Sequence, residues 1–587
     1  MAEIFAPSLE AYVPDDLTLP QFILDSHHPL RPIRPSHVPW FIDDASGRGV
    51  GYEEVRARTY GLANSLSLQF RIKDDDSVVI FSPNHIDYPV AIWATHRLGG
   101  VVSYVTRVLN LETNLTLPGF YPRCANPAYS IEELSYQINV VHPSLIITHS
   151  SCLDTALAAA QAASLPSERV ITFDDSNKMT VDNLIQNGLR SEPNFVERKL
   201  RKGEAKTKVA FLCFSSGTTG KPKAVAISHF GPLVSVIQKA ELQKVNKDYA
   251  PWEEQRFRPG DVAAGVVPFF HIYGLVLAIH FLPFCGISVV AIPKFNFREF
   301  LESIVRHRVS HLMLVPPQIV LLCKHPAVKD YDLTGIRLLN CGAAPLSAEL
   351  VDQVAKVLPN AQIGQGYGTT EASGTISMFS VDTKLGVPGS AGRLVPGIIA
   401  KVVKVDGTLA GFNEPGELQV KMPSVALGYL GNDEASKETF VNGWLRTGDE
   451  VIIREDLEVF IVDRLKEIMK VKGFQVAPAE LEGCLLDHPD VADTCVVPIP
   501  DTYSGELPMA FVVLHPNAAK KVASDPAEAE RVKASIKKHV ADNKVAYKHL
   551  AGGVQFTDII PKNPSGKLLR RVLRDRARDL VQLRSKL

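Results

Sequence analysis

Short apolar runs alternate with helical patterns through most of this chain. Val78-Val-Ile-Phe-Ser precedes a helix predicted over about 85–98, and Leu145-Ile-Ile-Thr follows a helix that the capping box Ser130-Ile-Glu-Glu133 should open. Four more strand-like runs lie at 287–292, 311–315, 336–341 and 361–366. Strand–helix alternation on this scale predicts parallel sheets covered by helices, and therefore an α/β fold.

The pattern changes in the last third of the chain. From about 386 to 458 the sequence is β-rich with frequent Gly and Pro, and beyond Arg464 a smaller α+β unit ends in a basic helix from Gly566. A chain of 587 residues is long enough for at least two domains. We predict a large N-terminal domain over 1–463 and a small mobile C-terminal domain over 464–587, with the Pro-rich first forty residues wrapping a surface.

One uncharged segment has the length of a membrane span. Residues 262–293 contain no Asp, Glu, Lys or Arg. Pro268 and Pro283, together with Gly274 and Gly286, divide the segment into strand, helix and strand pieces. The segment is therefore predicted to be buried core, and no transmembrane segment is expected.

The region 208–240 predicts a strand, a loop and a helix. Lys208-Val-Ala-Phe-Leu-Cys-Phe is an apolar run typical of a buried strand, and a helical pattern follows the loop. The loop consists of Ser215, Ser216, Gly217, Thr218, Thr219, Gly220, Lys221, Pro222 and Lys223. Its glycines let backbone N–H groups turn toward an anion, while its hydroxyls and lysines add donors and charge.

This loop predicts a polyphosphate cradle. It is not the common P-loop, because only two residues separate its glycines and Pro222 follows Lys221. The alternative is a flexible Ser/Gly linker, which the ordered elements on both sides disfavour.

Three further segments carry polar groups that suit a nucleotide. Gln365-Gly-Tyr-Gly-Thr-Thr-Glu371 predicts a tight glycine turn in which Thr370 can bond a phosphate oxygen and Glu371 can hold Mg²⁺. Gly443-Trp-Leu-Arg-Thr-Gly-Asp449 places a carboxylate after a glycine turn, where it can bond ribose hydroxyls. Pro561-Lys-Asn-Pro-Ser-Gly-Lys567 presents a lysine on a mobile loop, from which it can neutralise developing phosphoryl charge. Each segment alone is a weak signal, but their joint occurrence in this order is a strong one.

The order and the amino-acid sequences of these segments resemble those of the adenylate-forming superfamily, which comprises acyl-CoA synthetases, peptide-synthetase adenylation domains and luciferases. The resemblance covers roughly 52–571. Pro268-Phe-Phe-His-Ile-Tyr-Gly, Gly342-Ala-Ala-Pro-Leu and Lys470-Val-Lys-Gly-Phe-Gln-Val-Ala-Pro are most similar to 4-coumarate–CoA ligases and their fungal aryl- and acyl-CoA ligase relatives. This likeness implies a large AMP-binding domain of parallel-rich sheets with a β-rich subdomain, and a small domain that carries the catalytic lysine.

The resemblance also implies roles for individual residues. The ATP and AMP site would comprise the phosphate loop, Gly342, Ala343, Ala344, Pro345, Gln365, Gly366, Tyr367, Gly368, Thr370, Asp449 and Arg464. The catalytic group would comprise Lys567 for adenylation, His271 beside the substrate carboxylate, and Lys470 and Gln475, which act as the small domain reorients. Tyr273 and Thr369 would border the acyl pocket, Lys472, Gly473 and Phe474 would lie near CoA, Glu371 would hold the metal, and Lys466 would be the hinge.

The reaction implied by the resemblance has two halves. A carboxylate attacks the α-phosphate of Mg-ATP to give acyl-AMP and pyrophosphate, and the small domain then rotates to withdraw Lys567 and admit the CoA thiol. ATP, Mg²⁺ and coenzyme A are therefore expected, with an apolar aryl or fatty acid as the substrate. A stand-alone adenylation enzyme and a luciferase-like adenylate former are the alternatives. A non-enzymatic relative should have lost Lys567, Glu371 or the phosphate loop, and this chain retains them.

Several of these residues also have purely structural interpretations. His271 lies in an apolar run, where a core histidine is the usual finding, and Tyr273 can simply pack. Asp463 and Arg464 can form a surface ion pair at a domain boundary.

The sequence departs from the ligase pattern in two places. Thr369 occupies a position where these ligases usually have Met or Leu, so the sequence does not identify the substrate acid. Residues 104–123 form an unusual insertion without clear periodicity, between Ser103 and Cys124. We predict that this segment is an intron read through in frame and that the main transcript joins Ser103 to Cys124. The alternative is a genuine surface loop, since long surface insertions are tolerated.

Composition and the chain ends indicate compartment and partners. A net charge of −1 gives no reason to expect nucleic acid, and the basic stretch 567–586 is interrupted by apolar residues at helical spacing. The eight cysteines form no Cys-x-x-Cys pair, which favours buried thiols in a reducing compartment, and the N-terminus lacks a signal-peptide pattern. Ser585-Lys-Leu587 is a peroxisomal targeting tripeptide, so we expect import by the peroxisomal receptor in a eukaryotic, fungal cell.

Overall fold

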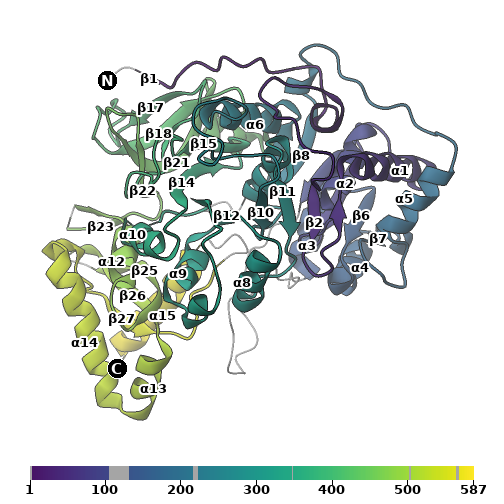
Figure 1. Ribbon diagram of the computed structural model, residues 1–587. Helices are drawn as coiled ribbons and strands as arrows, with labels where there is room; N and C mark the ends of the chain where they lie inside the picture. The colour runs from purple at the N-terminus through teal and green to yellow at the C-terminus, as the bar shows by residue number, and fades with distance from the viewer. Residues whose placement is uncertain are drawn as a thin grey trace.

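The computed structural model of the protein describes residues 3–104, 131–215, 222–346, 348–472, 474–501, 504–562 and 568–586. Parallel-rich sheets with helices around them make up the large N-terminal part, and a smaller unit lies beside α9 (Pro316–Lys324) and α10 (Ala348–Val357) (Figure 1). The two parts touch, because Lys324 Nζ donates to the carbonyl oxygen of Leu486 at 2.7 Å. The predicted α/β fold with a large and a small domain is confirmed.

The first sheet carries the strand that leads into the phosphate loop. Its strand order is β19-β9-β8-β5-β4-β6-β7. The strands are β4 (Ser77–Phe81), β5 (Val101–Tyr104), β6 (Leu145–Thr148), β7 (Val170–Thr172), β8 (Val209–Ser215), β9 (Lys223–Ser228) and β19 (Gly428–Tyr429). Strands β4 to β8 pair in parallel, whereas β9 and β19 are antiparallel to their neighbours.

The second sheet carries the strands that end at the candidate site. Its order is β16-β15-β14-β13-β12-β10-β11-β2-β3. The strands are β2 (Phe41–Asp43), β3 (Gly49–Val50), β10 (Val262–Gly265), β11 (Ser288–Ala291), β12 (His311–Leu314), β13 (Leu338–Cys341), β14 (Gln362–Thr369), β15 (Gly374–Met378) and β16 (Arg393–Leu394). The inner strands are parallel, and β3, β15 and β16 are antiparallel.

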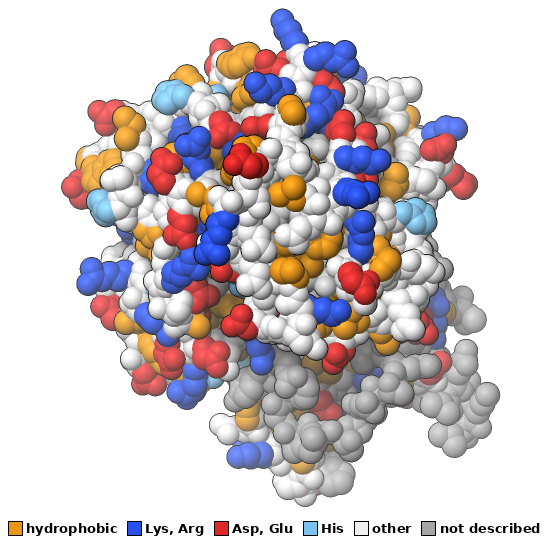
Figure 2. Space-filling model, turned by 90° about the vertical axis from the view of Figure 1, so that its right-hand side faces the viewer, with side chains coloured by type: hydrophobic (Ala, Val, Ile, Leu, Met, Phe, Trp, Pro, Cys, Tyr) orange, Lys and Arg blue, Asp and Glu red, His pale blue; other side chains and the backbone are white. Residues whose placement is uncertain are grey.

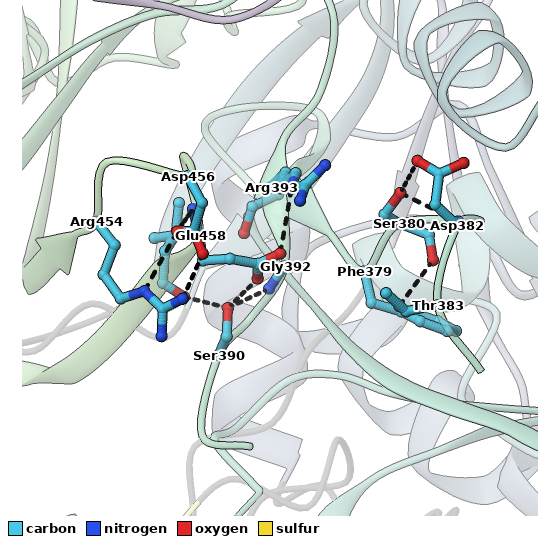
Figure 3. Close-up of polar contacts among 12 residues, drawn as sticks. Phe379, Ser380, Asp382, Thr383, Ser390, Gly392, Arg393, Arg454, Asp456 and Glu458 are labelled. Atoms are coloured by element: carbon cyan, nitrogen blue, oxygen red, sulfur yellow. Dashed lines mark hydrogen bonds and ion pairs between the residues drawn. The ribbon is translucent and has the colours of Figure 1, made fainter. Parts of the chain in front are cut away.

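An antiparallel sheet forms the β-rich subdomain. Its strands are β1 (Ile4–Phe5), β17 (Ile399–Val403), β18 (Gly416–Lys421), β20 (Phe440–Val441), β21 (Trp444–Ile453) and β22 (Val459–Arg464). Buried Glu458 ties this sheet to the second one: its carboxylate accepts from Ser390 Oγ at 2.6 Å and pairs with Arg393 Nε at 3.3 Å (Figure 3). The loop before β16 is therefore fixed to the start of β22.

The small unit is built on a sheet of its own. Its strands are β23 (Met469–Val471), β24 (Phe474–Val476), β25 (Val491–Asp501), β26 (Gly505–Leu514) and β27 (Gly553–Phe556). Its helices are α12 (Pro478–Leu486), α13 (Pro516–Ser524), α14 (Pro526–Asn543) and α15 (Arg570–Lys586).

The remaining helices belong to the large part. They are α1 (Tyr52–Phe70), α2 (Tyr88–Arg97), α3 (Ile131–Val141), α4 (Leu153–Ala162), α5 (Val181–Arg190), α6 (Phe230–Leu242), α7 (Leu282–Phe284), α8 (Phe297–Arg306) and α11 (Asp433–Thr439), with π-helices η1 (Gln21–Asp25) and η5 (Gly274–Phe281). Short 3-10 turns are η2 (Ser150–Cys152), η3 (Ser167–Arg169), η4 (Glu204–Lys206), η6 (Pro326–Asp330) and η7 (Ala546–Lys548). A helix such as α8 buries one stripe, with Phe300, Leu301 and Ile304 inside, because apolar residues recur every three or four positions.

The uncharged segment is buried core, as the sequence predicts. It forms β10, then η5 and α7, then β11, and the residues of these elements are buried apart from the partly exposed Val262. In the described part of the chain, no helix is both long and apolar enough to cross a membrane. The first residues also run along the molecule's surface, with β1 paired to β17 and Glu241 accepting from the backbone N–H of Ala11 at 2.7 Å (Figure 1).

The region 208–240 differs from its prediction. Strand β8 is followed by a second strand, β9, and the helix begins only at Phe230. The two strands form a hairpin in which Ser215 pairs with Lys223. The sequence Ala224-Val-Ala-Ile carries β-branched residues that are buried beside β8, and this tertiary pairing decides in favour of a strand.

Two other local predictions also need correction. Residues 365–369 continue strand β14 rather than forming a tight turn, and the chain turns only after Thr369. Asp449 lies within the long strand β21 rather than after a turn, although Gly443 does occupy the turn before it, with φ of +79°. Tyr104, the first residue of the predicted insertion 104–123, ends strand β5, whereas 105–123 lie outside the described residues. The origin of the insertion stays a prediction.

Candidate functional site

The carboxyl ends of neighbouring parallel strands bring the predicted nucleotide residues together. Strand β13 leads into Gly342 to Pro345, and β14, which pairs with β13 in parallel, leads into Thr370 and Glu371. In open α/β sheets, ligands bind outside these strand ends. The phosphate loop residues Ser216, Gly217, Thr218, Thr219, Gly220 and Lys221 lie outside the described residues, but their flanks, Ser215 and Lys223, close the hairpin.

Tyr429 connects Glu371 to Lys223 of the β8–β9 hairpin. The Tyr429 hydroxyl donates to Glu371 Oε1 at 3.0 Å, and Lys223 Nζ lies 5.0 Å from the centre of the Tyr429 ring. The backbone carbonyl of Glu371 accepts from Ala426 N–H at 2.8 Å, which fixes the turn. Burial, together with the charge of Glu371, raises the pKa of the Tyr429 hydroxyl, so this tyrosine stays a donor at neutral pH.

Glu371 is also the predicted metal ligand. Among the described residues, no group of three or more His, Cys, Asp or Glu side chains could hold a metal ion. A single carboxylate fits Mg²⁺, which keeps several waters and shares the oxygens of a bound phosphate, and does not fit a metal held by protein ligands alone.

Asp449 is held by two partners at the end of the β-rich sheet. The Tyr367 hydroxyl donates to Asp449 Oδ2 at 2.6 Å, and Arg464 Nε lies 3.1 Å from Oδ1. Asp449 and Arg464 are register partners on β21 and β22. Burial and then the Asp449 charge raise the pKa of the Tyr367 hydroxyl; burial lowers that of Arg464, but the surrounding carboxylates outweigh it and the net shift is upward.

The predicted adenine loop is fixed by Gln365. The Gln365 side chain accepts from Leu346 N–H at 2.7 Å and donates to the Leu346 carbonyl at 3.1 Å. Ala343 has a left-handed backbone with φ of +68°, an unusual conformation for a residue with a Cβ. Ala343 and Pro345 are exposed at the strand end, so this loop offers an open surface of the kind on which an adenine can lie.

Tyr273 packs on the same loop. A methyl group on Gly342 would lie 3.0 Å from Tyr273 Cζ, so a side chain at this position would crowd the ring. The Tyr273 hydroxyl donates to the Asn340 carbonyl and accepts from Asn340 Nδ2, both at 3.0 Å. Burial raises the pKa of this hydroxyl. Asn340 Oδ1 is buried and has no hydrogen-bond partner among the described residues.

His271 lies beside this tyrosine, and Thr369 lies two residues before Glu371. His271 Nδ1 accepts from Tyr273 N–H at 3.3 Å, just before η5. Thr369 Oγ1 accepts from Ala372 N–H at 3.1 Å, and Thr369 pairs with Gly374 across β14 and β15. The structure therefore places the predicted substrate residues beside the predicted nucleotide residues.

The predicted CoA and catalytic residues of the small unit form a separate group. Lys470 and Gln475 are exposed register partners on the β23–β24 hairpin. Lys472 occupies the turn with φ of +50°, and Phe474, 53% exposed, stacks on Tyr547 with ring centres 4.4 Å apart. Lys466 is exposed between β22 and β23. Gly473 and Lys567 lie outside the described residues.

The interpretation of Asp463 and Arg464 as one surface ion pair is wrong. Arg464 pairs with Asp449, while buried Asp463 accepts from Ala479 N–H at 3.1 Å and lies 3.8 Å from Arg570. Sequence reasoning also missed Tyr429 and Asn340. No sequence motif surrounds either residue, because each contributes to the site only by bonding a residue distant in the chain.

The surface carries charges of both signs. On the face shown in Figure 2, Lys and Arg side chains alternate with Asp and Glu and form no large basic patch. In the described part of the chain, the cysteines are free thiols, and all except Cys323 are buried.

Known proteins match almost the whole chain. The family of AMP-binding enzymes matches residues 34–430, and the C-terminal domain of AMP-binding enzymes matches 480–567. The chain is 34% identical over 573 residues to 4-coumarate-CoA ligase 1 of Narcissus pseudonarcissus, covering 97% of this chain and 95% of that protein. It is 34% identical over 540 residues to Peroxisomal OPC-8:0-CoA ligase 1 of Arabidopsis thaliana, covering 91% and 89%. The crystal structure of ATP-bound MatB from Rhodopseudomonas palustris is similar with a TM-score of 0.76 and 25% identity, covering 96% of this chain and 100% of that one.

Proposed function

The chain belongs to the family of AMP-binding enzymes, and from this premise we propose that it adenylates an apolar carboxylic acid with ATP and then transfers the acyl group to coenzyme A. It is an ATP-dependent acid–CoA ligase of the AMP-forming type. We further propose that the acid is an aryl or fatty acid and that the individual residues have the roles given below.

The observation that carries the proposal is the link from Glu371 through Tyr429 to Lys223. It brings a carboxylate that follows a strand of the second sheet close to Lys223 at the start of β9 in the first sheet. Triphosphate oxygens need donors and cations on several sides, and this arrangement supplies them from rigid strands. When bound with the nucleotide, magnesium neutralises phosphate charge, and Glu371 is the residue that would hold it.

In the first half-reaction, a carboxylate oxygen of the acid attacks the α-phosphorus of ATP, and the bond to pyrophosphate breaks. Asp449, already oriented by Tyr367 and Arg464, would accept hydrogen bonds from the ribose hydroxyls. His271 would orient the acid carboxylate, and Lys567 would neutralise charge as it develops on the phosphate.

In the second half-reaction, the CoA sulfur attacks the acyl carbon, and the bond between that carbon and the AMP oxygen breaks. The β23–β24 hairpin exposes Lys470, Lys472, Phe474 and Gln475, which suits a group that faces the site after a domain rotation. Lys466 lies in the connection between β22 and β23, where such a rotation would be centred.

We also propose that the protein is located in peroxisomes. Ser585-Lys-Leu587 has the form of an import signal that a receptor reads at a free carboxyl end, and one relative is named as peroxisomal. A fluorescent protein fused to the N-terminus should give puncta that disperse when these residues are removed. Diffuse fluorescence from the unaltered chain would contradict peroxisomal localisation.

The test of the ligase function is product analysis with a panel of aryl and fatty acids. We expect equal amounts of AMP, pyrophosphate and acyl-CoA, all dependent on the acid. A panel that yields acyl-AMP but no thioester would favour a stand-alone adenylation enzyme instead.

A further inference from the structure

Helix α6 carries a lysine that is completely inside the protein. Lys239 is 1% exposed and lies among apolar neighbours of α6 such as Val236 and Ile237. Its Nζ donates to Ser235 Oγ at 2.7 Å and lies 5.7 Å from the centre of the Phe281 ring. Within the described residues, no carboxylate forms an ion pair with it.

The ammonium group of Lys239 has fewer hydrogen-bond acceptors around it than it has donors. An ammonium group has three N–H donors, and within the described part of the chain only Ser235 Oγ accepts a hydrogen bond from Lys239. Burial lowers the pKa of Lys239 to about 7, which measures how unfavourable an unpaired cation is at this position. A buried polar group normally finds its partners in the protein, in water or in a ligand.

A series of close contacts connects Lys239 to Thr369. Thr369, a predicted pocket residue, pairs with Gly374 across β14 and β15. A methyl group on Gly374 would lie 3.0 Å from Ser235 Oγ, the atom that bonds Lys239, and 3.6 Å from Val276 Cγ1. Val276 belongs to η5, the helix that follows Tyr273 directly.

Gly374 lets the β14–β15 turn pack closely against helix α6. Its φ of +125° favours glycine, and the missing side chain leaves Ser235 facing the β14–β15 turn. The preceding residue, Ser373, has a buried Oγ without a hydrogen-bond partner among the described residues. Ser373 therefore adds one more hydroxyl next to α6, where its Oγ lies against Gly231.

We propose that Ser235 and Lys239 form the far end of the acyl pocket and bind an oxygen acceptor, a carboxylate or a carbonyl, on the substrate's end opposite the reacting carboxyl group. The inference rests on the proposed function and narrows the substrate class from apolar acids to acids with an apolar middle and a polar far end. An oxygen at this point would accept from the unused donors of Lys239, which an alkyl end leaves unsatisfied.

The experiment compares acids that differ only at the far end, which is a methyl group, a ketone or a second carboxylate. We would measure kcat/KM for acyl-CoA formation with the unaltered enzyme, with Lys239→Met and with Ser235→Ala. The unaltered enzyme should prefer one acceptor-ended acid over the methyl-ended acid, and Lys239→Met should reduce that preference about 10- to 100-fold. Whether the ketone or the carboxylate is preferred identifies the acceptor. Ser235→Ala should reduce the preference less, because the amine remains.

The control for folding is the melting temperature, which Lys239→Met should leave unchanged or raise, since Met replaces a buried unpaired cation. If Lys239→Met does not fold, the melting temperature of the unaltered protein is measured with each acid, and the acceptor-ended acid should raise it more. Equal selectivity in the unaltered enzyme and Lys239→Met, or equal thermal shifts from all acids, would overturn the inference. Absence of acyl-CoA from every acid would contradict the proposed function instead, and the thermal shifts would still test Lys239.

Discussion

Arg464 and Asp449 form an ion pair across β21 and β22, with Arg464 Nε 3.1 Å from Asp449 Oδ1. The neighbouring Asp463 turns the other way, accepts from Ala479 N–H of the small unit and lies 3.8 Å from Arg570. Successive residues of a strand point to opposite sides, so two adjacent residues serve two different parts of the protein. Asp449, the proposed ribose ligand, and the contact with the small unit are therefore held at the same end of β22.

The first prediction follows from the two partners of Asp449. Asp449→Asn should lower kcat/KM for adenylation by about 100-fold or more, because the amide cannot pair with Arg464 or accept equally from the ribose. Tyr367→Phe is the matched milder variant and should cost about 10-fold, since it removes one hydrogen bond to the same carboxylate. Pyrophosphate release measures both. Equal effects of the two variants would show that Asp449 does not act through its charge.

The second prediction concerns Tyr429 as a positioning residue. Tyr429→Phe should raise the concentration of Mg²⁺ needed for half-maximal adenylation several-fold, because Glu371 loses the donor that orients it. The KM for the acid should stay unchanged. Glu371→Gln, which removes the charge itself, should have a larger effect in the same direction. An unchanged magnesium requirement in Tyr429→Phe would contradict this role.

The third prediction concerns acid stability. Burial lowers the pKa of His96 to about 3 and that of His280 to about 4, and it lowers the pKa of His229 well below its usual value. These groups are neutral when folded but bind protons when unfolded below about pH 6.5, so their contribution to stability is present above that pH and lost as the pH falls. Each can lower the free energy of unfolding by up to about 1.4 kcal/mol per pH unit.

Urea unfolding from pH 7.5 to pH 5 checks this third prediction. Replacing His96 by Gln should make the decline of stability shallower, whatever it does to stability at pH 7.5. The exposed His37 is the control, and His37→Gln should leave the slope unchanged. A slope that His96→Gln does not alter would show that these histidines do not govern acid stability.

The fourth prediction separates the half-reactions. Lys567→Ala should nearly abolish acyl-AMP formation while preserving much of thioester formation from supplied acyl-AMP, because a lysine on the small domain can serve only one orientation. Lys470→Ala and Gln475→Ala, on the exposed hairpin, should change the balance toward loss of the second half-reaction. Equal loss of both half-reactions in Lys567→Ala would contradict the domain rotation.

The sequence predicted those features that local pattern determines. The parallel strands are buried on both faces, so β4, β11, β12 and β13 stand out as apolar runs. It failed where a distant partner decides the conformation. The segment 223–228 is a strand because β8 lies beside it, and Asp449 lies within a strand because β22 supplies Arg464.

The candidate site shows the same division. Motifs with a chemical signature, such as the phosphate loop and Glu371, are recognisable in sequence, whereas the contacts of Tyr429 with Glu371, of Asn340 with Tyr273 and of Lys239 with Phe281 join different elements. Lys239 alone carries a weak local signal, since it interrupts an apolar helix face, but a charged residue there has no meaning until burial is known.

The most direct measurement of the central claim follows the carboxylate oxygen. The acid is labelled with ¹⁸O in its carboxyl group and incubated with ATP, CoA and the enzyme, and the products are analysed by mass spectrometry. Because the acid oxygen attacks the α-phosphorus and stays there when the CoA sulfur takes the acyl carbon, the AMP should carry one ¹⁸O and the pyrophosphate none. Label in pyrophosphate or phosphate, or formation of ADP in place of AMP, would contradict an acyl-adenylate mechanism.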